Sequence, residues 1–130
     1  MKGDGVILDF AVRHYQVLAR ILAWVGILAI VVLSIVPAED RLLTGFAVSL
    51  EHFVAFGSVA ATFTVAYDLS PGRMVFLAFL FCAAVEVAQI PLATRHARFS
   101  DFVIDFVASC FAIAIVTLAK RKMSRLLPAR

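Results

Sequence analysis

Four long apolar runs, separated by short polar segments, dominate the chain. They cover residues 19–37, 43–67, 74–93 and 102–119. Each is close to or above the ~17–25 residues that a helix needs to cross a bilayer. The fourth is the shortest, and it spans only if Asp101 or Asp105 lies at the membrane interface. The pattern predicts an all-α membrane protein, a bundle of four transmembrane helices.

The two ends of the chain are more polar than its middle. Between residues 10 and 20, apolar positions alternate with Arg13, His14, Gln16 and Arg20. We expect a short amphipathic helical extension there, which either lies at the membrane interface or continues the first span into the cytoplasm. The chain is therefore divided into a tail and interfacial helix at 1–20, a four-helix membrane domain at 21–119, and a basic cytoplasmic tail at 120–130.

The composition excludes an ordinary soluble domain. Hydrophobic residues make up 63% of the chain and charged residues 16%, whereas soluble domains are about 45–50% apolar. A pI near 9.2 would indicate nucleic acid for a soluble chain, but here the basic residues flank the spans. We expect them to contact anionic lipid headgroups and not nucleic acid. Cys82 and Cys110 lie inside apolar runs, and we interpret them as small buried hydrophobes, not as a disulfide or metal pair.

The basic residues also predict an orientation. One side of the predicted bundle receives both chain ends and the turn at Arg73; the other side receives Arg41, Arg95 and Arg98. Cytoplasmic segments are enriched in Lys and Arg. Both termini are therefore expected in the cytoplasm, as the even number of spans allows, in a multi-pass protein of the inner membrane of a bacterium.

Polar side chains inside the apolar runs are the candidate functional residues. A charged Asp at the bilayer centre costs about 2.5–3.5 kcal/mol on insertion scales, so such groups usually mark function. With a helical rise of ~1.5 Å per residue, His52 lies roughly 13 Å and Glu86 roughly 10 Å below the outer ends of their spans. The shallower candidates are Gln89, Arg95, Arg98, Asp101 and Asp105. All of them fall in the outer half, which predicts one polar pocket open to the outside.

Helical spacing supports this convergence. Cys82, Glu86 and Gln89 share one face of the third span, and Asp101 and Asp105 share one face of the fourth. His52 and Glu86 are candidate catalytic residues that could transfer a proton. The other five are candidate ligand-binding residues.

Three alternatives stay open for these groups. Arg95 and Arg98 could hold the acids in their charged form, or grip a phosphate or carboxylate. His52 with Asp101 and Asp105 could also form a metal site, although we predict no metal and no cofactor. The whole set could instead be a hydrogen-bond network that only holds the bundle together. No HExxH, P-loop or GxSxG motif sharpens the choice, and whether the protein is an enzyme stays open.

The spacing of these polar residues resembles a known signature. Glu86-x-x-Gln89, followed by Arg95, Asp101 and Asp105, is similar to the signature of the VanZ-like family, which is named after a teicoplanin-resistance accessory protein. The signature continues with two small residues, matched in spacing by Ala108 and Ala112. His52 with Phe56 resembles its His-x-x-x-aromatic element, and Ser34-x-x-Pro37 resembles the end of its first span.

The chain departs from this family's pattern at several positions. Asp105 stands where the family usually has Asn, Arg98 where it commonly has Ser, and Ala108 and Ala112 where it has Gly. The basic residue that precedes the family's His is missing here. The resemblance covers roughly residues 34–112 and implies a small integral membrane protein of the cell envelope.

Two functions follow as expectations. The first is an envelope protein whose outward pocket binds or modifies a component such as a lipid-linked intermediate or a glycopeptide antibiotic, with a role in antibiotic resistance. The alternative is a structural accessory subunit that packs its small-residue faces against a larger membrane complex.

Overall fold

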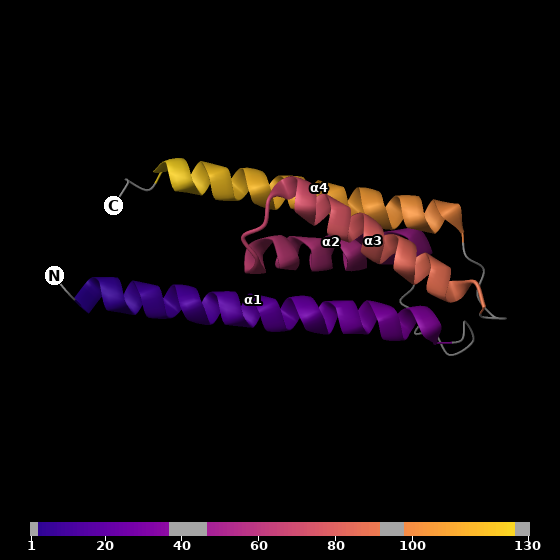
Figure 1. Ribbon diagram of the computed structural model, residues 1–130, viewed down its shortest axis with the longest axis horizontal. Coiled ribbons are helices and arrows are strands. Elements are labelled where there is room, and N and C mark those ends of the chain that lie inside the picture. Colours follow the sequence, from indigo (N-terminus) through magenta and orange to yellow (C-terminus); the bar gives the residue numbers. More distant parts are fainter. Residues whose placement is uncertain (1–2, 37–46, 92–97, 127–130) are drawn as a thin grey trace.

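Four helices form the part of the chain that the computed structural model describes, which is residues 3–36, 47–91 and 98–126. They are α1 (Gly3–Ile35), α2 (Val48–Ala66), α3 (Pro71–Gln89) and α4 (Phe99–Leu126) (Figure 1). All four are long and apolar enough to cross a membrane, and these described residues contain no strand. The prediction of an all-helical protein with four candidate spans is confirmed.

Prolines mark the ends of the helices. Pro71 occupies the first turn of α3 directly after its N-cap residue, Ser70. A proline is well placed there because the first helical N–H groups have no partner within the helix. The other three prolines in the sequence, at 37, 91 and 128, each follow the last residue of a helix by two positions. Since proline cannot continue a helix, these positions explain where the runs stop.

The first and last helices extend beyond the apolar runs. α1 begins at Gly3 and continues without interruption to Ile35, and α4 continues through its basic segment to Leu126. No proline interrupts either range, and Lys and Arg are good helix formers, so polarity alone does not end a helix there. The start of α1 and the end of α4 project at one end of the bundle, where the turn between α2 and α3 also lies (Figure 1).

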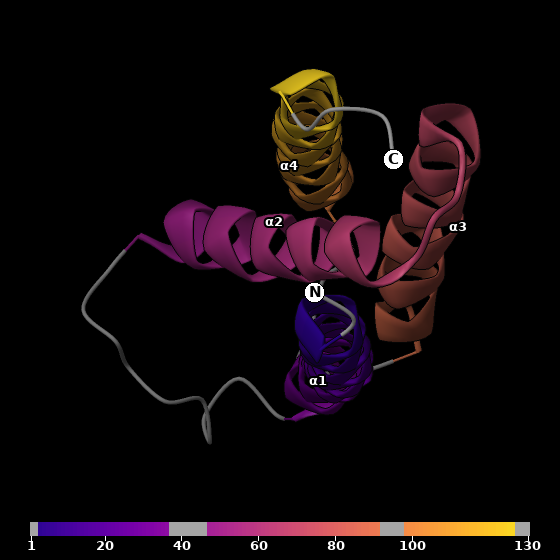
Figure 2. The same cartoon turned by 90° about the vertical axis from the view of Figure 1, so that its left-hand side faces the viewer.

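α2 is the central helix of the bundle. It packs against α1 on one side and α4 on the other, and α3 packs mainly along α4 (Figure 2). At the contact with α1, a Cβ added to Gly26 would lie 2.7 Å from Cγ2 of Val59. At the contact with α4, Gly57 faces Ala108, whose carbonyl oxygen would lie 3.6 Å from an added Cβ. Small residues therefore set the helix spacing on both sides of α2.

Few of the described side chains are buried, because four helices have little interior. Ile30, Phe56, Cys82 and Val85 form one apolar cluster. A second consists of Ala60, Met74 and Ile113. Both cysteines are free, and Cys82 is 1% exposed. This agrees with the interpretation of Cys82 as a small buried hydrophobe.

Candidate functional site

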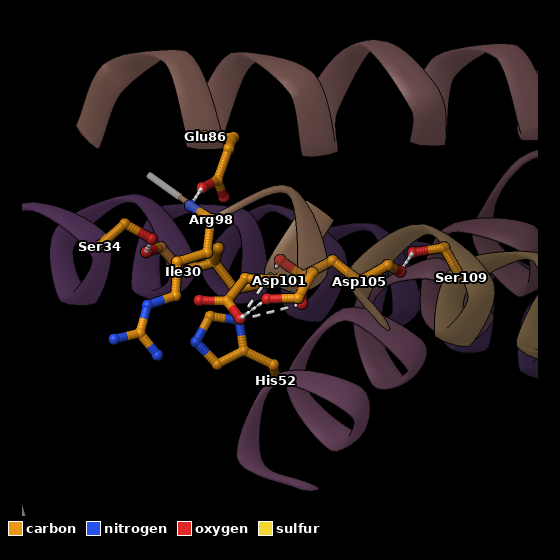
Figure 3. A network of polar contacts seen from close by, with 9 residues as sticks. Ile30, Ser34, His52, Glu86, Arg98, Asp101, Asp105 and Ser109 are labelled. Atoms are coloured by element: carbon orange, nitrogen blue, oxygen red, sulfur yellow. Dashed lines mark hydrogen bonds and ion pairs between the residues drawn. The ribbon is translucent and has the colours of Figure 1, made fainter. Parts of the chain in front are cut away.

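The most buried charged group of the described residues is a carboxylate paired with a histidine. Asp105 of α4 is 1% exposed. Its Oδ1 and Oδ2 atoms lie 3.0 and 3.3 Å from Nδ1 of His52 on α2 (Figure 3). The carboxylate can only accept when ionised, so Nδ1 carries the proton in that state. The pair joins the central helix to the last helix of the chain.

A second contact joins α3 to the start of α4. The backbone N–H of Arg98 donates a hydrogen bond to Oε1 of Glu86. Arg98 directly precedes α4, and its carbonyl accepts a bond from the backbone N–H of Asp101 at 2.8 Å. The sequence predicted that the Arg98 guanidinium could lie beside the acids, but this contact with Glu86 is made by the main-chain amide. Main-chain hydrogen bonds carry no residue-type signal, so the sequence could not have indicated it.

The two contacts belong to one cluster. Glu86 is close enough to Asp101, Asp105 and His52 to interact with each electrostatically. Figure 3 shows Glu86 descending from α3 toward Arg98, while Asp101 and Asp105 face His52 from α4. Carboxylates of α3 and α4 and the imidazole of α2 therefore meet at the end of the bundle opposite the chain ends.

Beneath this cluster the packing becomes apolar. The ring of Phe56 stacks on His52, with ring centroids 6.2 Å apart and planes inclined by 10°. On α4, Ser109 donates its hydroxyl to the carbonyl oxygen of Asp105 at 2.8 Å and is itself buried. Ser109 was not among the predicted site residues, although its position four residues after Asp105 is the signal that would have placed both on one helix face.

Most of the sequence-predicted site residues lie at this end of the bundle. His52, Glu86, Arg98, Asp101 and Asp105 form the cluster just described. Gln89 is 5% exposed and lies one turn beyond Glu86 on α3. Arg95 falls outside the described residues.

Within the described residues, the side chains of the cluster do not have the spacing of a metal centre. Across the described ranges, no group of three His, Cys, Asp or Glu side chains is placed to hold an ion. The described side chains of the cluster are suited to proton transfer and hydrogen bonding. When His52 is neutral and donates through Nδ1 to Asp105, its Nε2 is the proton-accepting atom of the ring, oriented by the carboxylate behind it. That is the arrangement a general base requires.

Comparisons with known protein families, with curated proteins and with solved structures find no match to this chain.

Proposed function

We propose that this chain is a VanZ-like membrane protein of the bacterial inner membrane whose polar cluster binds the anionic head of an envelope amphiphile. In this proposal both termini lie in the cytoplasm, so the cluster opens toward the outside. The ligand class is a lipid-linked phosphate or a glycopeptide. The observation that carries the proposal is the burial of Asp105 against His52 within an apolar bundle.

The energetic cost of that pair supports a functional role. Taking a carboxylate out of water costs several kcal/mol even after relaxation. A pair of apolar side chains of similar size would hold α2 against α4 without that cost. Ionisable residues inside membrane bundles therefore mark functional sites by default.

The entrance to the cluster is chemically suited to an anionic head. Arg98 is exposed, and it lies between the end of α3 and the first turn of α4. A guanidinium offers several N–H donors in a fixed geometry that fits phosphate and carboxylate oxygens. Arg95, three residues earlier in the sequence, would add a second guanidinium at the same level. Glu86 and the Nε2 atom of His52 would then face the head or its linkage, where they could exchange a proton.

The alternative is a structural subunit, and one observation favours it. Glu86 accepts a hydrogen bond from the Arg98 amide and Asp105 accepts one from His52, and both bonds join distant segments of this same chain. Such contacts stabilise the bundle whether or not a ligand binds. In that case the apolar surfaces of the helices, not the polar cluster, would carry the function by packing against a larger complex.

Two conservative variants separate the proposals. In Glu86→Gln, the side-chain oxygen still accepts from the Arg98 N–H, but the acid is gone. In His52→Asn, the amide N–H can still donate to Asp105, but the ring nitrogen that accepts a proton is gone. Each is expressed in a strain lacking the protein, and tolerance of envelope-directed antibiotics is measured alongside membrane insertion and thermal stability.

We expect both variants to insert and fold, and both to lose the tolerance that the unchanged protein restores. The matched control is Asp68→Asn, which removes an exposed acid from the turn between α2 and α3 at the opposite end. It should restore tolerance fully. If the two site variants restore it as well as this control does, the cluster performs no chemistry and the structural subunit is the better proposal.

A further inference from the structure

A second feature extends from the apolar packing beneath the polar cluster toward the opposite end of the bundle. A cavity of about 370 Å³ is enclosed by α1, α2 and α3, with a minor contribution from α4; we call it the Trp24 cavity. Its lining includes Phe63 of α2 and Tyr67, the residue directly after α2, together with Trp24 of α1 and Met74 and Leu77 of α3. Its volume falls within the ~300–1,000 Å³ typical of small-molecule sites.

The cavity opens outward between α1 and α3. Trp24 and Leu77, on its two walls, are 57% and 47% exposed. Both belong to helices that are apolar enough to span a membrane, so this opening faces the hydrocarbon of the bilayer. The side chains lining an empty apolar space lose van der Waals contacts on that side. In a membrane, the molecules at hand to fill such a space are acyl chains.

One end of the cavity carries polar groups. The indole N–H of Trp24 donates to the Tyr67 hydroxyl at 2.9 Å. The guanidinium carbon of Arg20 lies 5.3 Å from the centroid of the Tyr67 ring, and its Nε–H donates to the carbonyl oxygen of Ala66 at 3.4 Å. Since Ala66 is the last residue of α2, these contacts lie at the end of that candidate span.

Arg20 is placed to meet a headgroup at that level. Its side chain is exposed, and the bond to Ala66 uses one of its five N–H donors. Other basic residues gather at the same end of the bundle: Arg73 lies in the first turn of α3, and Lys120 and Arg121 lie in the last two turns of α4. Positive charge at the edge of a bilayer attracts anionic phospholipids.

We propose that the Trp24 cavity holds one acyl chain of an anionic phospholipid, drawn from the leaflet on the side of the chain ends, with its phosphate on Arg20. An apolar cavity continuous with the hydrocarbon selects a chain, and the guanidinium at its rim selects a negative headgroup. The site shares no charged residue with the polar cluster, so it stands whether or not the proposed function is correct.

The sequence itself supplies the probe for a test. Trp24 is the only tryptophan in the chain, and it lines the cavity. The full-length protein is reconstituted into phosphatidylcholine vesicles that contain a minor fraction of lipid brominated on its acyl chain, because bromine quenches tryptophan fluorescence on contact. The brominated lipid is either phosphatidylglycerol or phosphatidylcholine, at the same fraction. We expect brominated phosphatidylglycerol to be enriched about fivefold over brominated phosphatidylcholine beside Trp24. One basic residue near the membrane surface contributes about 1 kcal/mol of attraction to anionic lipid, which corresponds to this ratio.

Three variants identify the source of this preference. Arg20→Gln should abolish the difference between the two lipids. Arg125→Gln, which removes the same charge from the exposed last turn of α4, should retain it. Ala78→Phe places a ring in the cavity and should lower quenching by phosphatidylglycerol, with helix content checked by circular dichroism. If Ala78→Phe does not fold, the two arginine variants still decide.

Three results would overturn the proposal. Equal quenching by the two lipids in the unchanged protein would show ordinary boundary lipid and no selective site. An equal loss of preference in Arg20→Gln and Arg125→Gln would show general surface charge. Weak quenching by both lipids, together with cross-linked dimers, would show that a second copy of the chain covers the cavity.

Discussion

The buried carboxylate of Asp105 has the His52 side chain as its hydrogen-bond partner. Its carboxylate is almost completely enclosed, and both of its oxygens lie within 3.3 Å of the same ring nitrogen. Removing one member of a buried pair leaves the other uncompensated, which is far more costly than never having had the pair. The stability of the bundle should therefore respond asymmetrically to changes at positions 52 and 105.

We expect His52→Ala to lower the free energy of unfolding in detergent by about 3 kcal/mol, because Asp105 stays buried without its donor. Asp105→Asn should cost less, since the amide oxygen can still accept from Nδ1. The double variant His52→Leu with Asp105→Leu should be close to neutral. Thermal or denaturant unfolding of the purified variants measures all three. A double variant as unstable as His52→Ala would show that packing volume, not the unpaired charge, sets the cost.

At the scale of helices, α2 determines the spacing of the bundle. It contacts α1 through Val59 opposite Gly26, and α4 through Gly57 opposite Ala108. Three other small or weakly polar residues, Ala55, Ser58 and Thr62, share one face of this helix. Ser58 is exposed, and Thr62 bonds to the carbonyl of Ser58 within α2 at 2.7 Å. Glycine, not the weakly polar residues, permits the close approach to α1.

The contact between α1 and α2 can be tested by comparing two glycine-to-alanine variants, one at this contact and one in an open position. In Gly26→Ala the new Cβ would lie 2.7 Å from Val59, whereas in Gly72→Ala nothing lies within 4 Å of it. Overpacking destabilises a protein by about 1–3 kcal/mol, whereas replacing Gly by Ala inside a helix stabilises it by up to about 1 kcal/mol. Gly26→Ala should therefore destabilise the protein by up to about 2 kcal/mol, while Gly72→Ala should be neutral or slightly stabilising. Equal melting temperatures would argue against the close approach.

At the scale of the whole molecule, the proposed function depends on which side of the membrane each end of the bundle faces. In a background without Cys82 and Cys110, Thr94→Cys should react with an impermeant thiol reagent applied to intact cells. Ser70→Cys, in the turn between α2 and α3, should react only after permeabilisation. These outcomes follow from the excess of Lys and Arg on the side of the chain ends. The reverse labelling pattern would place the polar cluster in the cytoplasm and remove the outward pocket.

The fold was largely predictable because hydrophobic length and proline position act locally. Four apolar runs and four prolines place the helices within a few residues, except at the two ends, where helix continues into polar sequence. The shared face of Asp105 and Ala108 followed from spacing alone, and both are buried. The partners across helices were not predictable. Whether His52 pairs with Glu86 or Asp105 depends on the crossing of α2 and α4, and the bond from the Arg98 amide depends on the path of the backbone.

The pairing of His52 with Asp105 also has a consequence for biosynthesis. The two residues are 53 positions apart in the sequence, and α3 lies between them. During synthesis, α2 therefore reaches the membrane well before its polar partner has been made. Glu86 is likewise made before the Arg98 amide, its hydrogen-bond donor, which directly precedes α4. Arg98 and α4, which follow α3 in the sequence, supply both missing partners. A nascent chain that stops before residue 98 would thus lack both the Arg98 amide and the Asp105 carboxylate, and the polar groups of α2 and α3 would be in the membrane without these two contacts.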